Sequence, residues 1–155
     1  MGVLGLVIAL VVVLIGGVLF VGAVSGWFDD PKVVLDAEYY TERVEFIDLT
    51  ASEYEELAQA KKTFVVFVDQ GGCTTADRLR EYVKSYMVEK GISAYRMMFS
   101  EVKESSLHNQ VKYYPSVAII DKGVVRGYLR ADSDADAGIY NNYDEFREWM
   151  RKYLQ

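Results

Sequence analysis

The sequence is poor in three residue types: it has one cysteine, one histidine and two prolines among 155 residues. With Cys73 alone, the chain can close no internal disulfide. The low proline content and the lack of a low-complexity tract argue against long disordered segments. The single histidine, His108, stands alone in a polar stretch, which favours a surface position over a catalytic base.

Basic residues are also scarce relative to acidic ones. The chain has 17 Lys and Arg against 23 Asp and Glu, a formal net charge of -6. Nucleic-acid binding requires a basic face that neutralises phosphates, so the charge argues against a nucleic-acid partner. The length and the 51% hydrophobic content are those of one domain with an accessory segment.

The accessory segment is a charge-free apolar run from Val3 to Val24. As a helix, its ~22 residues would be ~33 Å long, enough to cross a ~30 Å hydrocarbon core. Trp27 and Phe28 follow as interfacial aromatics, so residues 1–28 are predicted to be a transmembrane anchor that contacts lipid through residues 3–24. A cleaved signal peptide is the alternative, with its cleavage site at residues 23–25, but the run is long for one and no basic residue precedes it.

Residues 29–43 are predicted to be a juxtamembrane linker that could add a short strand, and residues 44–155 the folded domain. Apolar, β-branched runs indicate strands and amphipathic spacing indicates helices. The expected order is β-α-β-α-β-α-β-β-α, with strands at 44–50, 63–68, 93–99, 116–120 and 124–130 and helices at 51–62, 74–90, 103–114 and 143–154. This order predicts an α/β domain with a mixed sheet and helices on both faces.

Two positions within this order carry a family resemblance. Cys73 lies where the second strand leads into a helix, and Pro115 opens the fourth strand about 40 residues later. In this arrangement residues 44–154 resemble the thioredoxin-like superfamily. The resemblance implies that Cys73 is the nucleophile, that the Tyr114–Pro115 peptide bond is cis, and that no metal or cofactor takes part. Substrate-binding positions implied with it are Gly72, Tyr114, Pro115 and Ser116.

The sequence departs from the family pattern in its active-site motif. The usual Cys-x-x-Cys reads Cys73-Thr74-Thr75-Ala76, so alanine replaces the resolving cysteine. Gly72 stands where the family has an aromatic residue. Phe67 occupies the position of the family's buried acid, and Asp69 is expected nearby but closer to the rim.

These departures leave two functions open. At a helix N-terminus, the helix dipole and the free N–H groups stabilise the thiolate form of a cysteine. Asp69 and Asp77 add negative charge nearby, which disfavours the thiolate. The first function is monothiol thiol-disulfide exchange between Cys73 and cysteine-containing client proteins. The second is a non-catalytic binding module in a membrane-associated assembly, in which Cys73 is a relic and the surface around Tyr114 and Pro115 binds a partner.

Two further expectations concern location and metal binding. We expect a single-pass protein of a bacterial cell membrane with its domain on the extracytoplasmic side, where a lone cysteine avoids spurious internal disulfides. Asp132, Asp134 and Asp136 imitate the first ligands of a calcium loop. Ala137 and Tyr143 occupy positions where such a loop needs glycine and glutamate, which favours a solvated acidic loop.

Overall fold

The computed structural model describes residues 31–155, and residues 32–155 form one compact unit. The predicted anchor, residues 1–28, lies outside the described residues. Within residues 31–155, no helix combines the length and apolar character needed to cross a membrane.

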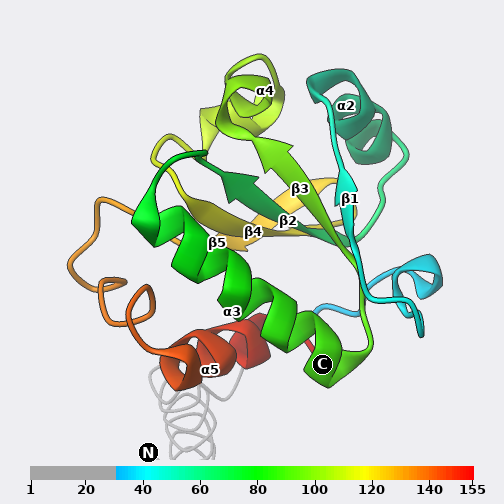
Figure 1. Ribbon diagram of the computed structural model, residues 1–155. Helices are drawn as coiled ribbons and strands as arrows, with labels where there is room; N and C mark the ends of the chain where they lie inside the picture. Colours follow the sequence, from blue (N-terminus) through cyan, green and yellow to red (C-terminus); the bar gives the residue numbers. More distant parts are fainter. Residues whose placement is uncertain (1–30) are drawn as a thin grey trace, which may run out of the picture. The chain divides into compact units, whose positions relative to one another are not determined.

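The described elements follow the predicted alternation of strands and helices (Figure 1). Each strand prediction is matched by a strand, with differences of a few residues at the ends. In chain order the elements are η1 (Ala37–Tyr39), β1 (Phe46–Asp48), α2 (Ala51–Gln59), β2 (Phe64–Asp69), α3 (Thr74–Lys90), β3 (Ala94–Met98), α4 (Phe99–Lys103), η2 (Ser106–Asn109), β4 (Ser116–Asp121), β5 (Val124–Tyr128) and α5 (Tyr143–Tyr153).

Residues 31–155 form a mixed five-stranded sheet in the order β1-β3-β2-β4-β5. β3 pairs in parallel with β1 and β2, whereas β4 is antiparallel to both β2 and β5. Val68 near the end of β2 pairs with Ser116 at the start of β4. The chain therefore enters β4 at the end of the sheet where β2 finishes. This register brings the residues around Pro115 close to the strand-to-helix turn that carries Cys73.

The predicted helix over 103–114 is wrong. The helix α4 starts earlier, at Phe99, and ends at Lys103, and the short 3-10 helix η2 follows it. The Ser105 hydroxyl donates to the Val102 carbonyl at 2.9 Å, and the backbone N–H of Ser106 donates to a Glu55 carboxylate oxygen at 2.6 Å. Serine side chains that bond the local backbone compete with helix propagation, which accounts for the break.

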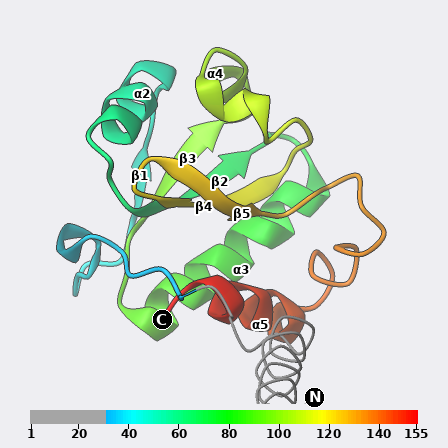
Figure 2. The same cartoon turned by 180° about the vertical axis from the view of Figure 1, so that it is seen from behind.

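The helices cover both faces of the sheet, as predicted. α2 and α4 lie on one face and α3 and α5 on the other, in both views (Figures 1 and 2). Every residue of the central strand β2 is buried, as expected for a strand covered on both sides. One face of α3 also points into the core, with five residues buried: Ala76, Leu79, Val83, Tyr86 and Met87.

The segment before residue 44 belongs to the domain rather than to a linker. Val33, Leu35 and Tyr39 are buried in the core. Val33 pairs with the end of α5: its N–H donates to the Tyr153 carbonyl at 2.6 Å, and its carbonyl accepts from the N–H of Gln155 at 3.2 Å. The sequence pattern gave no sign of these contacts because the apolar groups at residues 33–35 and 39–40 are short and stand among charged residues, so they show no strand or helix period. The domain therefore starts near residue 32, earlier than expected.

Local signals fix the ends of several elements. Thr50 and Glu53 form a reciprocal capping box at the start of α2. Gly91 ends α3 in the left-handed conformation, with φ 62°, which glycine adopts readily at the end of a helix. Lys122 and Gly123 both have positive φ in the tight turn between β4 and β5, and glycine adopts that conformation without steric cost.

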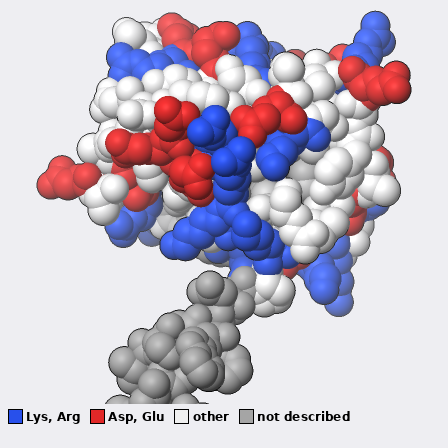
Figure 3. Space-filling view, turned by 90° about the horizontal axis from the view of Figure 1, so that it is seen from below, with Lys and Arg blue, Asp and Glu red and all other residues white. Residues whose placement is uncertain are grey.

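Acidic and basic side chains are interleaved on the face that carries α3 and α5 (Figure 3). Arg151 bridges the two helices by pairing with Glu89 of α3 at 2.9 Å, and it also pairs with Glu148 at 3.0 Å. Arg147 pairs with Asp144 at 2.9 Å. The positive charges on this face therefore alternate with negative ones, and the Arg151–Glu89 pair joins α5 to α3.

Candidate functional site

Cys73 is the residue that caps the N-terminus of α3. Its backbone is extended, with φ -114° and ψ 122°, and its side chain makes no capping hydrogen bond. Its carbonyl accepts the Asp77 N–H at 3.0 Å and so starts the helix. The thiol is free and partly exposed. The one thiol of the chain is thus held at a helix start without a structural partner for its sulfur.

The Tyr114–Pro115 peptide bond is cis, as the family resemblance implies. Together with Cys73 it borders a cavity of about 380 Å³. The structure therefore brings three of the predicted site residues to one place. The cavity is lined by Cys73, Thr75, Tyr114, Pro115, Ala131, Asp132, Ser133, Asp134, Ala137, Tyr140 and Asn141.

Two other predicted substrate-binding residues lie differently. Ser116 is completely buried, and its hydroxyl donates to the Leu129 carbonyl at 2.6 Å. That hydroxyl serves the packing of β4, so the prediction that Ser116 binds substrate is not supported for its side chain. Gly72 is exposed with φ +74°, and an added Cβ there would meet nothing within 4 Å. The approach to Cys73 along Gly72 is therefore open.

Ala76 occupies the place of the absent resolving cysteine. It is completely buried on the inward face of α3. An alanine at this point preserves the packing of the helix on the sheet, and it supplies no group that could attack a disulfide.

An ion-pair group of Asp69, Asp77 and Arg80 lies beside the Cys73 turn. Asp69 is only 3% exposed. The Arg80 guanidinium donates to both of its carboxylate oxygens, at 2.9 Å to Oδ1 and 3.2 Å to Oδ2, and to Asp77 at 2.8 Å. The hydrogen bond to Asp69 raises the pKa of Arg80 above its ordinary value.

The Arg80 guanidinium partly balances the negative charge that Asp69 and Asp77 place near the thiol. From the sequence, Asp69 and Asp77 only add negative charge near the thiol. In the structure one guanidinium pairs both carboxylates, and it also lies 6.0 Å from the centre of the Phe67 ring. The pairing could have been sought from the spacing, because Asp77 and Arg80 are three residues apart on a helix.

Tyr114 is held from two sides. Its hydroxyl is 2.9 Å from Nδ1 of His108, and its ring centre is 6.1 Å from that of Phe99. Partial burial raises the pKa of Tyr114 above its ordinary value. His108, expected as an isolated surface residue, is therefore a partner of a residue that lines the cavity.

The loop between β5 and α5 forms the second wall of the cavity. The Tyr140 hydroxyl donates to the Pro115 carbonyl at 2.8 Å, and burial raises the pKa of Tyr140. Arg78 of α3 donates to the side chain of Asn141. Both views place this loop beside the start of α3 (Figures 1 and 2). The acidic composition of the loop gives no sign of this wall, because Tyr140 and Asn141 contact residues far away in the sequence.

The calcium alternative for this loop gains no support from its geometry. Asp136 accepts the backbone N–H of Arg130 at 2.7 Å, which makes it a loop-closing residue. Within the part of the chain that the structure describes, no group of three or more His, Cys, Asp and Glu side chains is arranged to hold a metal ion.

Comparison with known proteins shows the fold. No protein-family model and no curated protein sequence matches the chain significantly. Among solved structures, the chain is similar to oxidised thioredoxin from Plasmodium falciparum, at 12% identity and a TM-score of 0.52 over 73% of this chain and 100% of that one. It is also similar to a mutant thioredoxin from Halobacterium salinarum, at 12% identity and a TM-score of 0.50 over 72% of this chain and 92% of that one. Oxidised thioredoxin O2 from Arabidopsis thaliana is similar at 10% identity and a TM-score of 0.50 over 74% of this chain and 99% of that one.

These likenesses establish a thioredoxin-like fold for the described domain. At this low identity they carry no assignment of activity, so the function must be argued from the site itself.

Proposed function

We propose that this chain is a membrane-tethered thioredoxin-like protein that exchanges thiol and disulfide with cysteine-containing client proteins through Cys73. The observation that carries the proposal is the joint placement of Cys73 and the cis Tyr114–Pro115 unit on one open cavity. The sulfur is partly exposed and has no bond to release before it reacts.

The proposed reaction needs only one protein thiol. The Cys73 thiolate attacks one sulfur of a client disulfide, a new S–S bond to Cys73 forms, and the client's other sulfur leaves as a thiolate. A second thiolate, from the client or from a small thiol, then attacks the mixed disulfide and regenerates Cys73. The two steps together exchange disulfide partners without net oxidation or reduction of the protein.

The absence of a second cysteine limits the reaction to this exchange. Net reduction of a client disulfide would require an external thiol in every cycle, because Ala76 cannot expel the client. The role that suits the site is therefore shuffling of client disulfides or their capture as mixed disulfides, and not independent disulfide reduction.

A thiol-trapping experiment tests the proposal. The full-length chain in a mild detergent is mixed with glutathione disulfide, and the mixed disulfide is followed by mass spectrometry, with Cys73→Ser as the blank. We expect a single adduct that an added thiol removes. A folded protein whose Cys73 forms no adduct would contradict exchange and favour the alternative of a non-catalytic binding module.

A matched variant tests whether the cavity contributes. Thr75 lines the cavity beside Cys73, whereas Thr74 does not. Thr75→Lys should change the rate of adduct formation with a protein disulfide more than Thr74→Lys does, because a bulky side chain at Thr75 obstructs the approach. Equal rates for the two variants would mean that clients approach from outside the cavity.

Tethering and orientation are part of the same proposal. The apolar run 3–24 supports a transmembrane anchor, and we propose a bacterial cell membrane with the domain on the extracytoplasmic side. Protease added to intact protoplasts should then degrade the domain. Survival of the domain until the membrane is lysed would place it inside, and recovery of the chain in the soluble fraction would exclude the anchor.

A further inference from the structure

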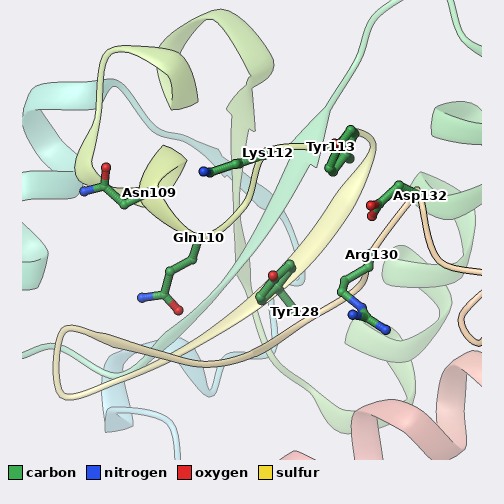
Figure 4. A pocket seen from close by; sticks show the side chains of 7 residues that line it. All are labelled: Asn109, Gln110, Lys112, Tyr113, Tyr128, Arg130 and Asp132. Carbon is green, nitrogen blue, oxygen red and sulfur yellow. The ribbon is translucent and has the colours of Figure 1, made fainter.

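A second groove lies next to the Cys73 cavity and is not used by the proposed exchange reaction (Figure 4). Its volume is about 430 Å³, and the residues that line it come from the end of η2, the segment before Pro115 and the end of β5. These residues are Asn109, Gln110, Lys112, Tyr113, Tyr128, Arg130 and Asp132.

The groove contains two cations that no carboxylate of the described domain neutralises. Lys112 is exposed and forms no ion pair within residues 31–155. The Arg130 guanidinium donates to the Ser133 hydroxyl at 2.9 Å, which is an uncharged partner. By contrast, Arg80, Arg147 and Arg151 are all bound to carboxylates. With Asp132 counted, the side chains that line the groove carry a net charge of about +1, so its cationic end suits an anionic ligand.

The other side chains in the groove suit a polypeptide. Tyr113 is 56% exposed and Tyr128 is half-buried, and Figure 4 shows both rings at the groove with the amides of Asn109 and Gln110 near its other end. Exposed tyrosine rings offer contact area at low conformational cost. Side-chain amides can both donate to and accept from a peptide backbone.

Asp132 joins this groove to the Cys73 cavity, because it lines both. Asp134 lines the Cys73 cavity as well. The two neighbouring sites therefore differ in charge: carboxylates border the thiol side, and Lys112 and Arg130 lie on the far side of Asp132. A bound chain would place its acidic residues beyond Asp132, away from the thiol.

We propose that this groove binds an acidic segment of the partner polypeptide, by ion pairs from Lys112 and Arg130 to Asp or Glu side chains. The inference rests on the proposed function for the identity of the partner as a client of Cys73. The binding itself needs no thiol, so it can be tested when Cys73 is absent.

The test uses peptides with serine in place of the client cysteine. Three peptides of equal length flank this serine with Asp and Glu, with Asn and Gln, or with Lys. Each is titrated into the full-length Cys73→Ser chain in zwitterionic detergent, and the backbone amide signals are followed by NMR. We expect the acidic peptide to shift signals of residues 109–113 and 128–132, with an affinity at least about threefold above that of the neutral peptide at low salt.

Charge variants assign the effect to the groove. Lys112→Glu combined with Arg130→Glu should abolish the preference for the acidic peptide. The control, Lys84→Glu with Lys90→Glu on α3, changes the net charge equally and should preserve it. Asp132→Asn removes a repelling carboxylate and should strengthen binding of the acidic peptide.

Three results would overturn the inference: equal affinity of the acidic and neutral peptides, loss of the preference in the α3 control, or no saturable shift with any of the peptides. Trapping of Cys73 by glutathione disulfide is measured separately on the unmodified chain. If the groove shows no preference for the acidic peptide but Cys73 forms the adduct, only the inference about the groove is refuted. If Cys73 forms no adduct but the groove prefers the acidic peptide, only the exchange reaction is refuted.

Discussion

Removal of Arg80 should destabilise the domain more than removal of any exposed cation on the same helix. Arg80→Leu leaves the 3% exposed Asp69 without the guanidinium that binds both of its oxygens. Breaking a fully buried pair costs about 3–5 kcal/mol, and a hydrogen bond to a charged group contributes about 1.5–3 kcal/mol. Because the Arg80 side chain is 24% exposed, water can partly replace it, so we expect a loss of about 2–3 kcal/mol.

The assay is urea denaturation of the full-length chain in a mild detergent, followed by circular dichroism. Lys84→Leu is the matched control, because Lys84 pairs with Glu81 on the same helix but both side chains are at least half exposed, 50% and 67%. An exposed pair of this kind contributes about 0.2–1 kcal/mol. The control variant should therefore unfold close to the parent.

A double-mutant cycle separates the charge from the packing. Asp69→Asn replaces the carboxylate by a neutral amide, so Arg80→Leu should cost about 1–2 kcal/mol less in that background than in the parent. The reasoning would be refuted if Arg80→Leu destabilised the domain no more than Lys84→Leu, or if its cost were the same with Asp69 and with asparagine.

Three other substitutions have defined outcomes. Ala76→Cys completes a Cys-x-x-Cys pair with Cys73 and should raise insulin reduction by a dithiol reductant above that of the parent; equal rates would show that the missing thiol is not what limits the site. Tyr140→Phe removes the bond to the Pro115 carbonyl and should cost about 1–3 kcal/mol in urea denaturation, and an unchanged midpoint would mean that water replaces the hydroxyl. Burial raises the pKa of Tyr86 from 10.0 to about 12, so its contribution to stability is complete below pH 10 and is lost as the pH rises toward 12. Tyr86→Phe should reduce that alkaline loss of stability, to which other buried tyrosines such as Tyr54 also contribute. Because the Tyr86 hydroxyl is buried without a partner in the described domain, the substitution should not destabilise the fold at pH 7.

The sheet and its helices could be predicted because their patterns are local. The apolar run that forms β2 is continuous in the sequence. Thr50 and Gly91 set the ends of α2 and α3 through contacts with residues a few positions away. The prediction that Cys73 lies close to Pro115 came from the family resemblance. The physical feature that brings the two residues together is the register of β4 against β2.

The parts that could not be predicted depend on contacts between distant residues. Nothing near Val33 in the sequence indicates that it pairs with the end of α5, and nothing near Tyr140 indicates a bond to Pro115. The burial of Ser116 also depends on a distant residue, because its hydroxyl donates to the Leu129 carbonyl.

The pairing of Val33 with the end of α5 determines how the domain would bear mechanical load. A pull transmitted through residue 31 reaches the two backbone bonds at Val33 first, and through them the last turn of α5. Both views place that end of α5 near the end of α3 that is opposite Cys73 (Figures 1 and 2). The 17 residues of α3 span about 25 Å at 1.5 Å per residue, so that length of helix separates the loaded end from the thiol. Under tension the domain would begin to open at the last turn of α5, the end of that helix farthest along the chain from Tyr140 and Asn141, which line the Cys73 cavity.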